Sequence, residues 1–287
     1  MSESKQDSLA VITDSAADLT NEMIAHYGIG VVDLSVTIGG ETFYGNNGIP
    51  AADLLARMEQ NHELAQTSMP SIGAFQEAYK KALETSDKVL SIHVSPSLSG
   101  TYNAALMAAK DFEGKIEVFD SQKLSMSEGF QVLEAARMNR EGHTLSAILE
   151  RLAIIRATIF QLTGFDSLDY LVKGGRIGKA SSLVGAMLNL KPSITVNKQG
   201  EFVPVMKSRG NKGAVKDTIK WIKENMGKHR RGVFAVGFAF NRDRAETLAA
   251  AIEEHFDAVG GVLIYEAGPV ISTHTGPGWG VTFYPCA

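Results

Sequence analysis

The chain has 287 residues, 44% hydrophobic and 21% charged, with a formal net charge of -4. This length favours two domains, and the balanced, slightly acidic composition offers no general attraction for nucleic acid or anionic lipid. No stretch reaches the roughly 18 apolar residues that a membrane span requires, and the first residues do not resemble a secretory signal. The single cysteine, Cys286, permits no intrachain disulfide and agrees with a reducing compartment. We therefore expect a cytoplasmic protein with no nucleic acid partner and no stable membrane insertion.

The first half of the chain alternates strand patterns with helix patterns. Short β-branched runs at 9–14, 88–95 and 115–120 predict buried strands, and apolar residues recur at helical spacing between them. This order predicts a parallel sheet covered on both faces. Residues 30–45 interrupt it with two strands around the doublet Gly39-Gly40, which suits a tight hairpin, so we expect a β-ribbon arm there.

The second half has a different order of elements. Helices near 126–140 and 144–156, followed by a strand within 157–165, lead into a second lobe. In this lobe we expect strands at 191–197, 202–207, 232–240 and 261–268 and helices at 213–226 and 243–256. The predicted domains are therefore an N-terminal α/β domain at 1–157, with the ribbon inserted at about 30–45, and a C-terminal α+β domain at 158–287.

Hydroxyl side chains collect where predicted strands end. The clusters are Thr13 and Ser15, Thr67, Ser68 and Ser71, the run from Ser95 to Thr101, and Ser121, Ser125 and Ser127. Helix capping explains single members, and we expect it for Thr20, Ser71 and Thr101. Ligands of open parallel sheets bind beyond the carboxyl ends of the strands, so several clusters at that edge indicate a binding site facing one cleft.

The chemistry of these clusters favours a small anion. Hydroxyls and backbone amides donate hydrogen bonds without adding charge, which suits one carboxylate better than a polyphosphate. Residues 174–180 lack the spacing of a phosphate-binding loop, and no dinucleotide-binding glycine pattern follows the first strand. We expect no nucleotide site on this chain.

Two further stretches are unusual. Leu183, Val184, Met187 and Leu188 would form an apolar helix face, which serves either as core or as the lining of a long apolar tunnel. His274 is predicted in a loop after a strand, and the glycines of 276–280 favour a turn that lets the backbone approach another group. The histidines have no metal-ligand spacing, so no metal site is expected.

An ordered set of motifs resembles the DegV family over nearly the whole chain. They include TDSAADL at 13–19, TSMPS at 67–71, SLSGTY at 97–102, KGGRIG at 173–178 and STHTGPG at 272–278. The resemblance implies a two-domain fold with a parallel-sheet domain, a β-ribbon arm and an α+β domain, and a fatty acid buried between the domains. It also implies that the protein is a non-catalytic lipid-binding subunit of a bacterial fatty acid kinase, active in phospholipid metabolism. A separate subunit would then supply ATP and magnesium, and this chain would need no cofactor.

The same resemblance assigns roles to individual residues. It implies that hydroxyl and imidazole groups bind the carboxylate, that the arginine supports the histidine, and that Arg176 and His274 assist phosphoryl transfer. The ligand-binding positions are Thr67, Ser99, His274 and Arg176, with Ser68 and Thr101 as near alternatives. The chain departs from the family pattern at 209–216, which is less basic than usual, and at Ser272, where a glycine is usual.

Two other functions stay open on the sequence. Ser99 would be the nucleophile and His274 the base of a lipid or ester hydrolase, although SLSGT lacks the G-x-S-x-G turn of such enzymes. A fatty acid store or sensor without a kinase partner is the other alternative.

Overall fold

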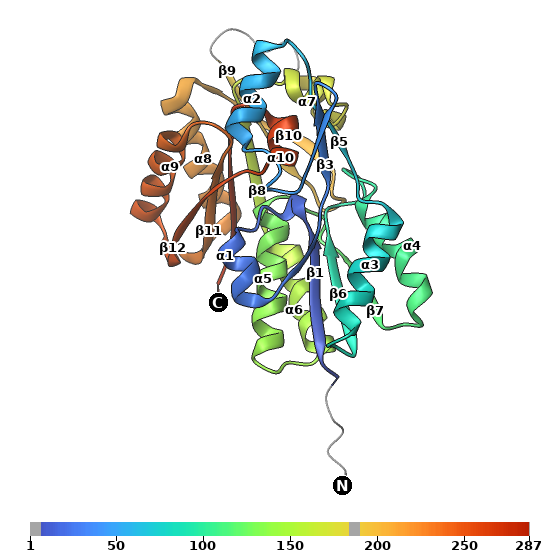
Figure 1. Cartoon of the computed structure of the whole chain (residues 1–287). Coiled ribbons are helices and arrows are strands. Elements are labelled where there is room, and N and C mark those ends of the chain that lie inside the picture. The colour runs from blue at the N-terminus through green and yellow to red at the C-terminus, as the bar shows by residue number, and fades with distance from the viewer. Residues whose placement is uncertain (1–6, 184–189, 287) are drawn as a thin grey trace. The chain divides into compact units, whose positions relative to one another are not determined.

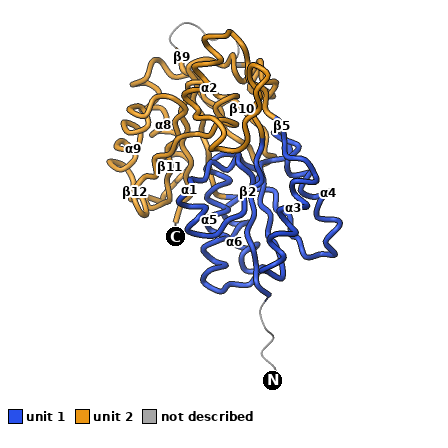
Figure 2. The backbone as a smooth tube through the Cα atoms, viewed as in Figure 1, with its two compact units in different colours: residues 1–34, 68–157 blue, residues 35–67, 158–287 orange. Residues whose placement is uncertain are grey.

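The computed structural model describes residues 7–183 and 190–286, which form two compact units. The first comprises Met1–Leu34 and Ser68–Ala157, and the second comprises Ser35–Thr67 and Thr158–Ala287 (Figure 2). The chain therefore passes between the units three times.

The first unit is built on a four-stranded parallel sheet in the order β2-β1-β6-β7 (Figure 1). The strands predicted at 9–14, 88–95 and 115–120 are confirmed. The strands are β1 (Leu9–Asp14), β2 (Gly30–Val32), β6 (Lys88–His93) and β7 (Ile116–Asp120). The helices are η1 (Ser15–Ala17), α1 (Asn21–Tyr27), α3 (Ile72–Leu83), α4 (Thr101–Ala109), η2 (Lys110–Phe112), α5 (Met126–Arg140) and α6 (Leu145–Thr158).

Burial on both faces explains why these strands are apolar runs and not alternating sequences. On one face, Phe75 and Tyr79 of α3 and Ala105 of α4 pack against Ile12 and Val89 of the sheet. On the other face, α5 packs against β1 and β6. Small alanines on α4 bring that helix close to the strands, so the carboxyl ends of β1, β6 and β7 have fixed positions.

The second unit contains a six-stranded mixed sheet in the order β10-β9-β8-β13-β11-β12, in which the pair β11 and β12 is parallel. Helices α8 and α9 bury Ile222 and Leu248 against Phe234, Val281 and their neighbours. The strands are β8 (Phe160–Phe165), β9 (Leu190–Val196), β10 (Phe202–Arg209), β11 (Arg231–Phe238), β12 (Asp257–Glu266) and β13 (Gly278–Pro285). The helices are α7 (Asp169–Lys173), η3 (Gly178–Leu183), α8 (Gly210–Met226), α9 (Arg242–His255) and α10 (Pro269–Thr275).

The predicted ribbon is a hairpin of β3 (Ser35–Ile38) and β4 (Glu41–Tyr44). Gly39 and Gly40 have φ values of 58° and 79°, a backbone conformation that only glycine adopts without strain. β5 (Gln66–Ser68) completes a small sheet in the order β4-β3-β5, and α2 (Ala51–Gln60) packs against α10. Because of these contacts the ribbon groups with the second unit and not with the N-terminal domain to which we assigned it.

Two elements at the C-terminal end differ from the sequence prediction. The segment containing His274 is the helix α10 and not a loop, and Gly278 and Gly280 belong to strand β13 and not to a turn. The predicted close approach of the backbone does occur, because the Tyr170 ring fills the space where a Cβ of Gly276 would lie. Of the predicted apolar helix face, Leu183 ends η3, and Val184, Met187 and Leu188 lie outside the described residues.

Close packing of an aromatic ring on Gly164 gives a test of this fold. A Cβ on Gly164 would overlap the indole of Trp279, its partner across β8 and β13, so Gly164→Ala should lower the free energy of unfolding by about 1–3 kcal/mol. Gly213→Ala in α8 is the matched control, because the nearest atom to its Cβ is 4.0 Å away. It should raise the free energy of unfolding by about 0.5–1 kcal/mol. Urea unfolding measures both, and equal stability of Gly164→Ala and the unaltered protein would contradict the packing.

Candidate functional site

The hydroxyl-rich loops of the first unit meet at the carboxyl ends of β1, β6 and β7, as expected. Ser95 donates its amide hydrogen to the carbonyl of Lys123 at 2.9 Å, and Ser125 donates its own to the carbonyl of Ala16 at 2.7 Å. Most hydroxyls there lie inside the protein: Thr13, Ser15, Ser95, Ser121, Ser125 and Ser127 are each at most 5% exposed. These groups therefore hold the loops together, and only a smaller set remains for a ligand.

Ser97 and Ser99 are the accessible hydroxyls in the loop after β6, and Ser99 is the half-buried one. Its Oγ lies 2.8 Å from the Oγ1 of Thr101 and accepts the amide hydrogen of Thr101 at 3.3 Å. Ser99 therefore accepts an amide hydrogen at the start of α4. Thr101, which we predicted as the cap, is instead the first residue of the helix and is buried. Thr20 and Ser71 do cap α1 and α3.

Thr67 and His274 form a pair within the second unit. The Thr67 Oγ1 lies 2.8 Å from the Nε2 of His274, although the two residues are 207 positions apart. Both side chains are half-buried, whereas Ser68, the neighbouring alternative, is exposed. The structure therefore brings together two of the predicted ligand-binding residues.

Helix α10 fixes the direction of the His274 ring. Pro269 occupies its first turn and Gly276 follows its last residue, which are start and stop signals that the sequence contained. Ser272, the departure from the family pattern, is buried and donates its hydroxyl hydrogen to the carbonyl of Ala267, so it fits without disturbing the helix. A Cβ on Gly174 would lie 2.5 Å from the Nδ1 of His274, which shows how closely the α7 end covers the ring.

The electrostatic environment keeps the imidazole neutral. Burial first, and then the positive charge of Arg176, lower the pKa of His274 to about 4. Within the described residues the buried Nδ1 has no hydrogen-bond partner. Buried N–H groups without an acceptor are rarer in proteins than buried acceptors without a donor, so we assign the ring proton to Nε2. The favoured tautomer therefore donates from Nε2 to Thr67, which frees the Thr67 hydroxyl hydrogen for another acceptor.

Arg176 bonds the backbone beside the histidine. Its guanidinium donates to the carbonyl of Gly174 at 2.6 Å, and its side chain is exposed. The charge therefore sits near the imidazole through the Gly174 segment, without a direct hydrogen bond to the ring.

The geometry opposes the hydrolase interpretation. A serine hydrolase needs an acceptor, usually a carboxylate, on the second nitrogen of its histidine. In the part of the chain that the structure describes, no such acceptor bonds His274, and a pKa of about 4 makes the ring a weak base at neutral pH.

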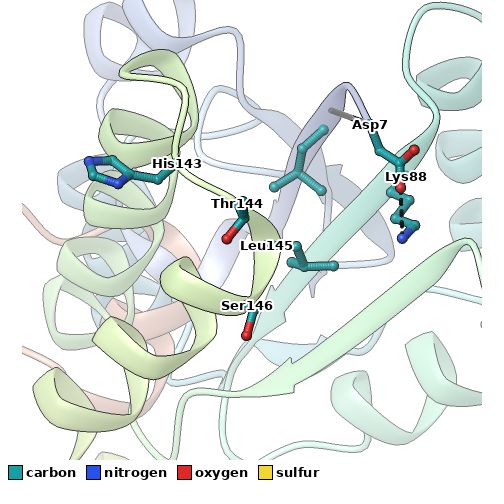
Figure 3. Close-up of a pocket in the computed structure, with 7 residues that line it drawn as sticks. Asp7, Lys88, His143, Thr144, Leu145 and Ser146 are labelled. Carbon is teal, nitrogen blue, oxygen red and sulfur yellow. Dashed lines mark ion pairs between the residues drawn. The ribbon is translucent and has the colours of Figure 1, made fainter. Parts of the chain in front are cut away.

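The first unit also has a surface pocket of about 320 Å³ at the opposite edge of its sheet (Figure 3). It is lined by the starts of β1 and β6 and of α6, with an ion pair of 2.8 Å between Lys88 and Asp7. None of the predicted site residues lines it. Over residues 7–183 and 190–286 no cluster of histidine, cysteine or carboxylate side chains suits a metal ion, and no helix is long and apolar enough to cross a membrane.

Sequence reasoning missed the buried partners of the first unit, above all His93 and Ser91. The sequence did contain an indication of them, because Ser91 and His93 are two residues apart and so lie on the same face of a largely apolar strand.

Comparison with known proteins gives consistent matches over the whole length. The model of the uncharacterised DegV protein family matches residues 8–286. A DegV domain-containing protein of Deinococcus radiodurans is 34% identical over 273 residues, or 94% of this chain and 96% of that protein. A solved DegV family protein of Thermus thermophilus, described as binding fatty acid, is 32% identical, with a TM-score of 0.93 over 97% of this chain and 99% of that chain. The DegV of Bacillus subtilis, described as a fatty acid binding protein, is 26% identical, with a TM-score of 0.87 over 98% of this chain and 100% of that chain.

The lowered pKa of His274 predicts how stability depends on pH. The unfolded chain takes up the proton near pH 6.5, whereas the folded ring resists it until about pH 4. Between these values the unfolded state binds more protons, so the protein loses stability as pH falls. Relative to His274→Gln, which cannot titrate, the unaltered protein should lose on the order of 1–2 kcal/mol between pH 7 and pH 5. Urea unfolding at both pH values measures the loss, and an imidazole that titrates near pH 6.5 by NMR would refute it.

Proposed function

Because the chain belongs to the DegV family, we propose that it binds one long-chain fatty acid and holds the carboxylate through hydroxyl groups. The observation that carries this proposal is the bond between Thr67 and a neutral His274, which leaves a hydroxyl hydrogen available to an acceptor. The fatty acid binding described for the relatives from Thermus thermophilus and Bacillus subtilis supports the choice of ligand.

The carboxylate receives its hydrogen bonds from Thr67 and Ser99. Ser68 is an exposed alternative to Thr67, and Thr101 is a buried alternative whose hydroxyl bonds that of Ser99. A hydrogen bond to a charged group contributes roughly 1.5–3 kcal/mol, and neutral donors avoid the cost of burying a second charge. Arg176 is exposed and adds a favourable electrostatic potential at longer range.

The acyl chain supplies most of the affinity. Burying about 14–16 methylenes at roughly 0.8 kcal/mol each gives about 11–13 kcal/mol. The loss of translational and rotational freedom on association costs about 4 kcal/mol or more and reduces this gain. The head group therefore sets the register of the ligand, and the shape of the tunnel selects the chain. The location of the acyl chain in the molecule stays a prediction.

The bound fatty acid is presented in the cytoplasm to a separate kinase subunit that binds ATP and magnesium. That subunit transfers the terminal phosphoryl group to a carboxylate oxygen, which yields acyl phosphate and ADP. A carboxylate is already ionised at neutral pH, so the step needs in-line positioning and charge stabilisation but no general base. In this scheme Arg176 and His274 assist the transfer, and the product enters phospholipid synthesis.

Removing single hydroxyls tests the carboxylate clamp. Thr67→Val and Ser99→Ala should each weaken binding of palmitic acid about 10-fold or more, because each loses one bond to a charged oxygen. Competition against a fluorescent fatty acid measures the dissociation constants. The matched controls Thr85→Val and Ser146→Ala remove exposed hydroxyls, one just after α3 and one in α6, that are not among the predicted site residues, and they should bind as the unaltered protein does.

Other results would favour the alternatives. Purified protein that carries no fatty acid on denaturing extraction, and binds none when offered, would overturn the proposal. Hydrolysis of a chromogenic ester that disappears in Ser99→Ala would establish the hydrolase instead.

Arg176→Ala separates transfer from binding. Charge is needed most while the phosphoryl group moves, so with the ATP-binding subunit of a bacterial fatty acid kinase, acyl phosphate formation should fall about 10-fold or more. Retention of palmitic acid should change far less. Arg242→Ala, an exposed arginine on α9, is the control. Equal loss of binding and transfer would defeat this role, and absence of transfer with the unaltered protein would favour a store or sensor.

A further inference from the structure

The carboxylate of Asp14 collects hydrogen bonds where the strands of the first unit end. Asp14 is 1% exposed and is the last residue of β1. Its Oδ1 accepts the amide hydrogen of Ala16 at 2.9 Å. Its Oδ2 accepts the amide hydrogen of Val94 at 3.1 Å and lies 2.9 Å from the Nδ1 of His93. One side chain thus ties the end of β1 to the end of β6.

A buried chain of hydrogen bonds ends at this carboxylate. The Nε2 of His93 lies 2.6 Å from the Oγ of Ser91, which accepts the hydroxyl hydrogen of Tyr79 at 3.0 Å. Burial raises the pKa of Tyr79 to about 12, so the phenol keeps its proton. Each hydrogen finds an acceptor when the chain runs from Tyr79 through Ser91 and His93 to Asp14. This direction places the imidazole proton on Nδ1.

The order serine, histidine, aspartate is that of a hydrolase relay, but it does no such chemistry here. Ser91 and His93 are 0% exposed, so no substrate reaches the hydroxyl. The role of the chain is therefore to fix the orientation of Asp14, since a satisfied buried network is rigid.

The backbone that leaves this network leads directly to Ser99. The amide of Val94 is held by Asp14, and the next amide, that of Ser95, is held by the carbonyl of Lys123. The carbonyl of Ser95 then accepts the amide hydrogen of Ser99 at 3.1 Å. A continuous path of bonded backbone therefore links Val94 to Ser99.

We infer that Asp14 is a positioning residue of the ligand site: through Val94 it fixes the loop that presents Ser99 to the carboxylate of the fatty acid. This inference rests on the proposed function. It assigns to the buried network a role in recognising the acid group, beyond its contribution to stability.

Asp14→Asn tests the inference. An amide replaces one acceptor oxygen with a donor that faces N–H groups, so a tie to Ala16 or to Val94 is lost. We expect the preference for palmitic acid over 1-hexadecanol, measured as the ratio of their dissociation constants, to fall about 10-fold. Affinity for the alcohol should change less than about 2-fold, because the tail contacts are intact. A merely structural defect would weaken both ligands together.

A double-mutant cycle identifies Ser99 as the route. In the Ser99→Ala background, Asp14→Asn should reduce the acid preference no further. Tyr79→Phe is the control, because it removes only the far end of the chain and should keep the preference. If Asp14→Asn does not fold, His93→Gln, which can donate to Asp14 and accept from Ser91, should keep the preference, and His93→Leu should lose part of it.

The outcomes separate the two hypotheses. An unaltered protein with no preference for the acid would overturn the proposed function. A normal preference in both Asp14→Asn and Asp14→Ala, which removes both acceptor oxygens, or effects of Asp14→Asn and Ser99→Ala that add, would overturn the positioning role alone. An equal preference for the acid in His93→Gln and His93→Leu would also overturn the positioning role.

Discussion

Polar groups that leave water must find partners inside the protein, and this constraint shapes both units. In the first unit, three parallel strands end among hydroxyls and carboxylates that bond one another and so hold the loops. In the second unit, the imidazole of His274 remains neutral and pairs with Thr67. The positions of the Thr67 and Ser99 hydroxyls follow from the hydrogen bonds made by the groups around them.

With neutral donors, the head group and the acyl tail of a bound acid make different contributions to recognition. In the proposed function, neutral hydroxyl donors bind the acid group without the cost of burying a second charge, while the acyl tail contributes most of the affinity. Arg176 stays exposed and supplies charge without being buried. Two closely packed glycines, Gly174 against His274 and Gly276 against Tyr170, keep α7 and α10 near enough for this arrangement.

Local sequence predicted what depends on local physics. The strand at 9–14 is apolar because both faces are covered, and the hairpin at Gly39-Gly40 needs two residues with positive φ. The short helix α10 lacks enough turns for a periodic pattern, so His274 was wrongly expected in a loop. The ribbon joins the second unit because α10 packs against α2 and β3, contacts that composition does not encode.

The candidate site was predictable only in part. Hydroxyl clusters at strand ends indicated a small anion, but family resemblance, and not spacing, related Thr67 to a histidine 207 positions later. The buried partners of Asp14 were missed because the spacing of Ser91 and His93 puts them on one face of β6 but does not relate that face to Asp14, which is 79 positions before His93.

The long separation between Thr67 and His274 has a consequence for the growing chain. During synthesis the threonine leaves the ribosome long before α10 is made, and β13, which follows α10, completes the mixed sheet last. A nascent polypeptide therefore lacks the bond between Thr67 and His274, and the proposed lipid binding begins only when translation is nearly finished.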